Sequence, residues 1–237
     1  MKQLVSLILL AVVGWLLLDL VPHGQAGEPG PVATRYITEG VADNRGANLV
    51  TSVIVNYRGF DTLGEVTVLF LSVAGAGFVL RRREGRRPAR PRPASEFLQT
   101  GARLLFAPMV LFGVYIFVHG HLSPGGGFQG GAVVASAVLL LLLANRDLHL
   151  PHGFMGWLES MAGFGYVLVG LLGLAFGGSF LANRGVVPLG DWNRLFSAGL
   201  IPIIYTLVGL KVGTELSALL DALMDTGRGA EAEGSES

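Results

Sequence analysis

Residues 119–133 read HGHLSPGGGFQGGAV and separate two strongly apolar runs. A proline followed by three glycines does not continue an apolar helix, so we expect the chain to turn here. At membrane depth, such irregular backbone is tolerated only where protein buries it or where it lines a wet cavity. The stretch therefore predicts a break between two transmembrane helices, with polar groups placed at that break.

The composition is that of an integral membrane protein. Apolar residues fill 51% of 237 positions and charged residues 14%, whereas soluble domains carry about 25% charged residues. The 35 glycines suit helices that pack closely in lipid. The absence of cysteine excludes disulfides, thiolate metal sites and a cysteine nucleophile. The formal net charge is zero, and we expect no nucleic-acid partner.

We predict an all-α fold with about six transmembrane helices, because a hydrocarbon core of about 30 Å needs roughly 20 apolar residues. One span, residues 66–80, is an uncharged run that crosses comfortably only if its helix begins near Asp61. Asp61 and Glu65 would then lie at or inside the membrane boundary. The other five predicted spans are residues 4–21, 101–118, 128–144, 154–176 and 194–220.

Arginine sets the predicted orientation. The stretch RRREGRRPARPRP at 81–93 carries seven of the 17 Lys and Arg residues, and short basic loops remain in the cytoplasm. We therefore expect a multi-pass protein of the cell's inner membrane with both termini cytoplasmic and residues 119–127 outside. An alternative for residues 1–21 is a cleaved secretory signal peptide. Its loss would leave the position of the basic linker unexplained.

The same linker divides the chain into modules. We predict a two-helix module at 1–80, an Arg/Pro-rich cytoplasmic linker at 81–94 and a four-helix module at 95–220. The tail at 221–237 is mildly acidic and rich in Gly, Ala and Ser, a composition typical of disorder.

Two carboxylates at the start of the second span are candidates for an ion path. Asp61 and Glu65 could form an acidic mouth for cations or protons, because ionisable groups at membrane depth usually face a polar interior. The alternative is a capping box, in which Thr62 and Glu65 satisfy the first backbone N–H groups of a helix. The preceding residues 47–57 have helical apolar spacing and predict a short interfacial helix.

A second candidate pair lies in the last span. Lys211 and Glu215 are four residues apart, on one face of a helix, and could form an internal ion pair with Thr214 in a helix bent by Pro202. Lys211 could instead extend to the cytoplasmic headgroups. For Glu159, near the cytoplasmic end of its span, an interfacial role is the expectation.

The turn at 119–133 offers histidines. His119 and His121 are two residues apart, so they do not share a helix face, and no nearby carboxylate completes a metal shell. They are either hydrogen-bonded loop residues or proton relays. The breaker residues themselves are Pro124, Gly125, Gly126, Gly127 and Phe128. We expect no metal, no cofactor and no catalytic constellation, because the motifs of hydrolases, zinc proteases and phosphate loops are missing.

Glycines at 156, 163, 170 and 177 recur every seventh residue of the predicted 154–176 span. Seven residues nearly complete two helical turns, so these glycines line one narrow stripe. This stripe predicts close contact with another helix.

Two motif sets resemble a known family. HGHLSPGGGFQGGAV, followed by FSAGLIPIIYTLVGLKVGTELS at 196–217, resembles the MnhB/MrpB-type component of the Mrp-type multisubunit sodium/proton antiporters over about residues 95–220. NLVTSVIVNYRGFDTLGEVTVL at 48–69 resembles the C-terminal part of the large component of those antiporters. It is similar also to a small membrane component of gas-evolving membrane-bound hydrogenases. Asn56 stands where the family often has an aspartate, which leaves open any cation site that needs that acid.

The resemblance implies a membrane component of a large ion-translocating complex related to the membrane arm of respiratory complex I. Sodium ions and protons, lipid and other membrane subunits of an antiporter or hydrogenase would be its partners. The resemblance implies that this chain exchanges no ions alone. The alternatives are the equivalent component of a redox-driven complex and a scaffold that conducts nothing.

Overall fold

The computed structural model describes residues 2–20, 28–81, 94–145 and 147–234. Within these ranges the chain is helical and has no strand, which confirms the predicted all-α membrane fold. Residues 1–37 and 38–237 form two compact units, and each is described by itself. The elements in chain order are α1 (Lys2–Leu20), α2 (Pro31–Asn44), α3 (Leu49–Thr51), a π-helical segment η2 (Ser52–Tyr57), α4 (Gly59–Arg81), α5 (Glu96–Val118), α6 (Gly127–Ala144), α7 (His152–Gly177) and α8 (Ile201–Gly234).

The first unit holds α1 and the start of α2. The apolar run of α1, Leu4–Leu18, contains no charged residue. At 1.5 Å per residue it covers roughly 22 Å, less than the hydrocarbon core of about 30 Å. A sixth membrane crossing at α1 therefore stays a prediction.

The second unit holds five helices that are long and apolar enough to cross a membrane. They are α4, α5, α6, α7 and the first 24 residues of α8. Three of them, α5, α6 and α7, begin within five residues of the predicted positions. The short predicted run at 66–80 extends upstream to Gly59, so Asp61 lies in the first turn of α4.

The last span differs from the prediction at both ends. Residues 194–200 are not helical, because Ala198 and Gly199 have positive φ and the Ala198 amide donates to the carbonyl of Leu189. Pro202 is consequently the second residue of α8, where its missing N–H breaks no helical bond. The expected bend at Pro202 is wrong. At the other end, α8 continues through Asp221 to Gly234, across most of the segment predicted to be disordered.

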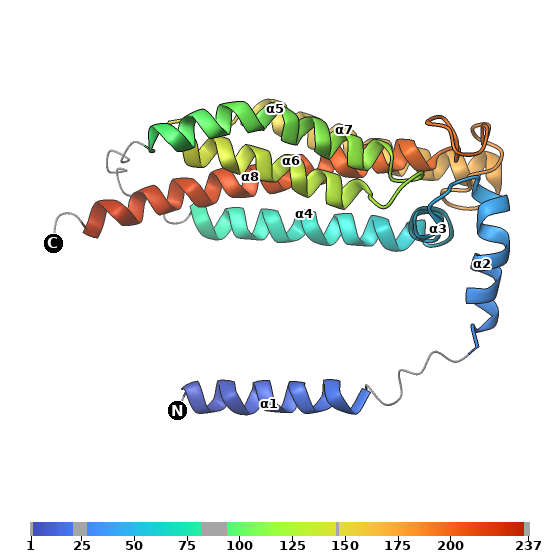
Figure 1. Ribbon diagram of the computed structural model, residues 1–237, viewed down its shortest axis with the longest axis horizontal. Helices are drawn as coiled ribbons and strands as arrows, with labels where there is room; N and C mark the ends of the chain where they lie inside the picture. The colour runs from blue at the N-terminus through green and yellow to red at the C-terminus, as the bar shows by residue number, and fades with distance from the viewer. Residues whose placement is uncertain (1, 21–27, 82–93, 146, 235–237) are drawn as a thin grey trace. The chain divides into compact units, whose positions relative to one another are not determined.

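Helix α8 is the centre of the second unit (Figure 1). It packs against α4, α5, α6 and α7. Half of the residues in an apolar stretch of 18 residues of α8 are buried, whereas only 6% are buried in the corresponding stretch of α4. Glu215 and Asp221 on α8 are therefore enclosed by other helices, whereas Asp61 and Glu65 on α4 are exposed in this chain.

Glycines allow the helices to approach closely. A Cβ on Gly131 of α6 would lie 2.8 Å from the carbonyl oxygen of Gly209 on α8, and one on Gly163 of α7 would lie 3.7 Å from the Lys211 side chain. Gly170 and Gly177 instead face Phe180 and Ala182, in the loop after α7. Within this chain, the predicted glycine stripe thus contacts α8 at Gly163 and the loop after α7 at Gly170 and Gly177.

Three connections meet at one end of the helical bundle (Figure 1). Thr51 donates its hydroxyl to the carbonyl of Gly120 at 2.7 Å, which joins α3 to the α5–α6 turn. The Leu181 amide donates to Gly170, which folds the loop after α7 back onto that helix. Of the predicted interfacial segment, Thr51 and Ser52 face the protein while Val50 and Ile54 remain exposed.

Candidate functional site

Helix α8 buries a row of polar side chains. Lys211 is 12% exposed and Glu215 is fully buried, one turn apart on the helix that the others surround. Thr214 donates its hydroxyl to the carbonyls of Leu210 and Lys211, so it satisfies itself within the helix. The remaining members of this row are Ser217 and Asp221.

The charged side chains of this row form a three-membered cluster. The Nζ atom of Lys211 lies 2.6 Å from Oε1 of Glu215 and 3.6 Å from Oε1 of Glu159 on α7. It also lies 4.9 Å from the centre of the Phe70 ring of α4, a favourable position for a cation over an aromatic face. Of the two alternatives for Lys211, the internal ion pair is the one present. We call Lys211, Glu215 and Glu159 the ion cluster.

If both carboxyl groups are ionised, the ion cluster has two negative charges and one positive charge. Neither carboxyl oxygen of Glu215 has a well-aligned hydrogen bond, although Oε1 contacts the ammonium group. An ionised carboxylate inside a protein is stable only when paired and hydrogen-bonded. The arrangement can hold one extra proton or exchange it for a small cation, which is the chemistry that an ion path requires.

Glu159 lies beside Lys211 at 21% exposure, and its expected interfacial position stays a prediction. A sequence signal for the place beside Lys211 existed. Glu159 precedes Gly163 by four residues and so shares its helix face, and Gly163 faces Lys211. The glycine stripe therefore indicated the face on which the partner of Lys211 lies.

The candidates on α4 lie in different surroundings. Asp61 pairs with Arg58 at 2.6 Å, but their side chains are 52% and 64% exposed. Glu65 is exposed as well. The predicted capping box is absent, because Thr62 lies inside α4 and donates its hydroxyl to the carbonyl of Ile54 at 2.9 Å. Neither carboxylate joins the ion cluster, and their role in an ion path stays a prediction.

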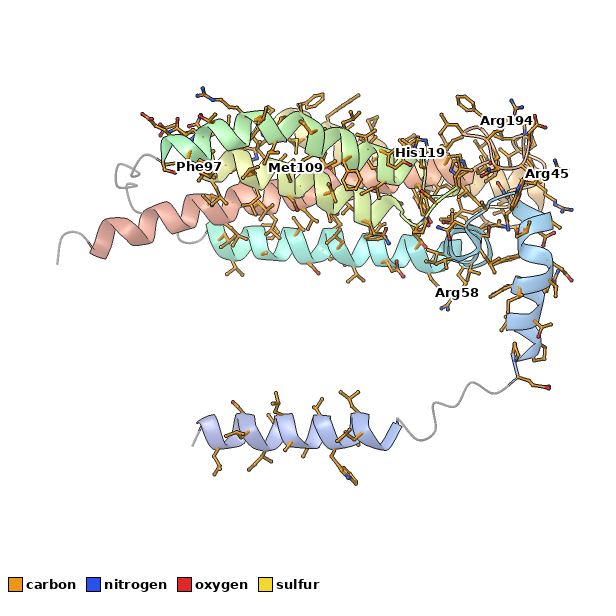
Figure 2. All side chains as sticks on the ribbon, in the orientation of Figure 1. Arg45, Arg58, Phe97, Met109, His119 and Arg194 are labelled. Carbon is orange, nitrogen blue, oxygen red and sulfur yellow. The ribbon has the colours of Figure 1, made fainter. Side chains whose placement is uncertain are left out.

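The two histidines of the α5–α6 turn differ in burial. His119 stacks on the Tyr115 ring with centres 4.2 Å apart, at the loop end of the bundle (Figure 2). His121 is fully buried. Its Nε2 lies 3.4 Å from the carbonyl oxygen of Arg194, and its Nδ1 has no partner. Burial lowers the pKa of His121, and the backbone carbonyl of Arg194 partly opposes that shift.

The breaker run forms the turn and the start of α6. Gly126 is the N-cap residue of α6, and Gly127 and Phe128 begin the helix. A Cβ on Gly127 would lie 2.6 Å from Cβ of Val208, and one on Gly125 would lie 2.9 Å from the carbonyl oxygen of Ile116. Pro124 is exposed in the turn. Close approach of other backbone and side chains explains these glycines.

Three asparagine side chains form hydrogen bonds between the connecting segments at the loop end of the bundle. Their grouping was not predicted from the sequence. The side-chain oxygen of Asn44 accepts from the amides of Asn56 at 2.6 Å and Asn183 at 3.1 Å. Asn183 in turn accepts from the Leu200 amide just before α8. Asn56, at the position where an aspartate is often expected, is thus part of a neutral hydrogen-bonded network.

Among the described residues, no group of three or more His, Cys, Asp or Glu side chains could hold a metal ion. The fold and the paired charges inside it define a multi-pass helical membrane protein with a buried ion cluster.

Family models cover nearly the whole chain. Residues 97–218 match a domain related to the MnhB subunit of Na⁺/H⁺ antiporter, and residues 5–100 match MbhE, a subunit of MBH. The chain belongs to the MnhB-related family, with an MbhE-like segment before that domain.

Individual relatives agree with this membership. A protein of Methanocaldococcus jannaschii is 32% identical over 199 residues, which cover 72% of this chain and 74% of the relative. A Na⁺/H⁺ antiporter subunit of Bacillus subtilis is 40% identical over 94 residues, 36% of this chain and 62% of that protein.

Two solved complexes contain a similar chain. One is the membrane-bound sulfane sulfur reductase, an archaeal respiratory membrane complex, with 43% identity and a TM-score of 0.81. That match covers 94% of this chain and 98% of the other. The second is the Mrp complex from Dietzia sp. DQ12-45-1b, with 26% identity and a TM-score of 0.72, covering 94% of this chain and 26% of the other.

Proposed function

We propose that this chain is a membrane subunit of a multisubunit sodium/proton antiporter complex and that its ion cluster is part of the ion path. The enclosed position of Lys211, Glu215 and Glu159 carries the proposal, because buried charges of this kind usually mark ion or proton pathways in membrane proteins. Membership in the MnhB-related family supports sodium and protons as the exchanged ions.

The chain acts as part of an assembly in this proposal. Many large apolar side chains of α4, α5 and α7 are exposed, among them Phe78, Leu104 and Phe164. These surfaces need lipid or other membrane subunits to cover them. The protein would lie in the cell's inner membrane with both termini in the cytoplasm, as the basic linker at 81–93 indicates. It would itself catalyse no reaction.

The equivalent component of a redox-driven complex is a second candidate. Its specific support is the 43% identity, over nearly the full length of both chains, to a chain of the sulfane sulfur reductase complex. Antiporter and redox-driven assemblies would use the same membrane component and differ in their other chains.

Purification of the tagged chain from native membranes tests both candidates. We expect several other membrane subunits to copurify, and we expect sodium-dependent proton exchange after reconstitution into proteoliposomes. Copurified iron–sulfur subunits with proton transport driven by a reductant would favour the redox complex. Exchange by the isolated chain, or an assembled complex that transports neither ion, would contradict the proposal.

A further inference from the structure

Besides Glu215, α8 carries a second buried carboxylate, that of Asp221, which lies closer to the C-terminal end of the helix. The Asp221 side chain is fully buried, and its Oδ2 accepts from the Leu150 amide at 3.3 Å. The same oxygen lies 3.3 Å from Nε2 of His152, while Oδ1 is buried without a partner. A buried carboxyl oxygen without a hydrogen bond is costly and requires an explanation.

His152 places an exposed imidazole beside this buried carboxylate. It is the first residue of α7, and its side chain is 64% exposed. An imidazole takes up and releases protons near neutral pH. An exposed imidazole and a buried carboxylate thus lie within hydrogen-bond distance of each other.

The pair lies about two helical turns from the ion cluster along both helices. His152 and Glu159 are seven residues apart on one face of α7, about 10 Å by helix rise, and Asp221 and Glu215 are six apart on α8, about 9 Å. Gly156 lies between His152 and Glu159 and is itself exposed, and a Cβ there would meet nothing within 4 Å. A proton that leaves Asp221 for Glu215 therefore needs water molecules with polar partners along this interval.

The segment before α7 carries two further titratable residues among those that the structure describes. Asp147 and His149 belong to the same loop and are exposed, and α6 contains no titratable residue. Among the described residues, His152 is the one that forms an ion pair with Asp221.

We propose that His152 and Asp221 form a proton port between the aqueous phase beside residues 145–151 and the ion cluster. His152 accepts a proton from water and donates the Nε2 proton to Oδ2 of Asp221. The carboxyl group then passes a proton through water toward Glu215 and becomes ionised again. This proposal rests on the proposed function, because the port would supply protons to the ion path through the ion cluster.

The competing explanation is structural, because the bond from the Leu150 amide to Asp221 also pins the loop onto α8. Asp221→Asn keeps an acceptor oxygen for that amide but cannot carry a proton. His152→Ala removes an exposed ring and should leave folding intact. Asp147→Asn and His149→Ala are matched controls from the same loop.

The test uses the assembled complex and two readouts. After a pH jump on the side of the loop, infrared spectroscopy follows the carboxyl C=O band that Asp221→Asn removes. We expect His152→Ala to slow the appearance of this band at least tenfold and added imidazole to restore it, while both controls leave it unchanged. A pH-independent band, an unchanged rate or a failure of imidazole rescue would overturn the port.

Ion exchange is measured on the same samples as the second readout. We expect exchange to fall in parallel with the band kinetics in His152→Ala. If the wild-type complex shows no exchange at all, the proposed function fails, and the band kinetics still decide whether the port exists. If Asp221→Asn does not assemble, the band cannot be assigned to Asp221, and the loss of exchange in His152→Ala with its rescue by added imidazole decides instead.

Discussion

Two ion pairs in this chain have the same length and opposite surroundings. The carboxylate of Asp61 lies 2.6 Å from Arg58, and that of Glu215 lies 2.6 Å from Lys211. The first pair is more than half exposed, whereas Glu215 is fully buried. Exposed pairs contribute about 0–1 kcal/mol, but removing one partner of a buried pair costs about 3–5 kcal/mol. The two ion pairs differ in how deeply their charged groups are buried, and not in the distance between those groups.

The difference follows from where each helix lies. Helix α8 is surrounded by α4, α5, α6 and α7, and Glu215 and Asp221 on it are buried in protein. In an apolar stretch of 18 residues of α4 only 6% of the residues are buried, and Asp61 in the first turn of this helix is exposed. The buried charges of Lys211 and Glu215 are paired within the chain, whereas Asp61 on α4 remains accessible to lipid, water or another protein of the complex.

The largest expected effect on stability comes from removing the positive charge of the buried pair, and the exposed pair serves as the comparison. Lys211→Ala leaves Glu215 buried without its counter-charge and should lower the free energy of unfolding by about 3–5 kcal/mol. Arg58→Ala should cost about 1 kcal/mol or less. Thermal denaturation of the purified complex compares the two variants. Equal losses would remove the distinction between the buried and the exposed pair.

Glycine substitutions extend the comparison to the helix surfaces. A Cβ on Gly127 of α6 would lie 2.6 Å from Val208, whereas one on Gly64 of α4 meets nothing within 4 Å. Gly127→Ala should therefore destabilise the complex by about 1–3 kcal/mol through overpacking. Gly64→Ala should be neutral or slightly stabilising in a helix. The yield of assembled complex and its melting temperature measure both, and a tolerated Gly127→Ala would show that α6 and α8 can move apart.

The smallest effect concerns a buried group outside the spans. Because burial lowers the pKa of His121, the folded protein binds a proton there less readily than the unfolded chain does. This contribution to stability is fully present above the unfolded pKa of about 6.5 and is lost as the pH falls through the lowered folded value. His121→Gln should flatten the dependence of melting temperature on pH between about 8 and 5. His119→Gln is the control, and an equal flattening by both would contradict this assignment.

The sequence predicted the helices well because each apolar run is bounded by a clear break. It missed the start of α8, since the apolar residues at 195–201 look continuous with the helix while the positive φ of Ala198 and Gly199 interrupts it. The spacing of Lys211 and Glu215 predicted their pairing. It did not predict Glu159 as a partner or His152 beside Asp221, because contacts between α7 and α8 depend on how the two helices dock.

Exchange by the assembled complex carrying Glu215→Gln tests the function of the ion cluster most directly. Glutamine keeps the shape of the side chain and its contact with Lys211 but removes the charge and the exchangeable proton. Sodium-dependent proton exchange is measured in proteoliposomes against pH, with Asp61→Asn as the matched variant of the exposed pair. We expect at least a tenfold loss for Glu215→Gln and near-normal exchange for Asp61→Asn. A fully assembled Glu215→Gln complex with the wild-type rate at every pH would contradict the account.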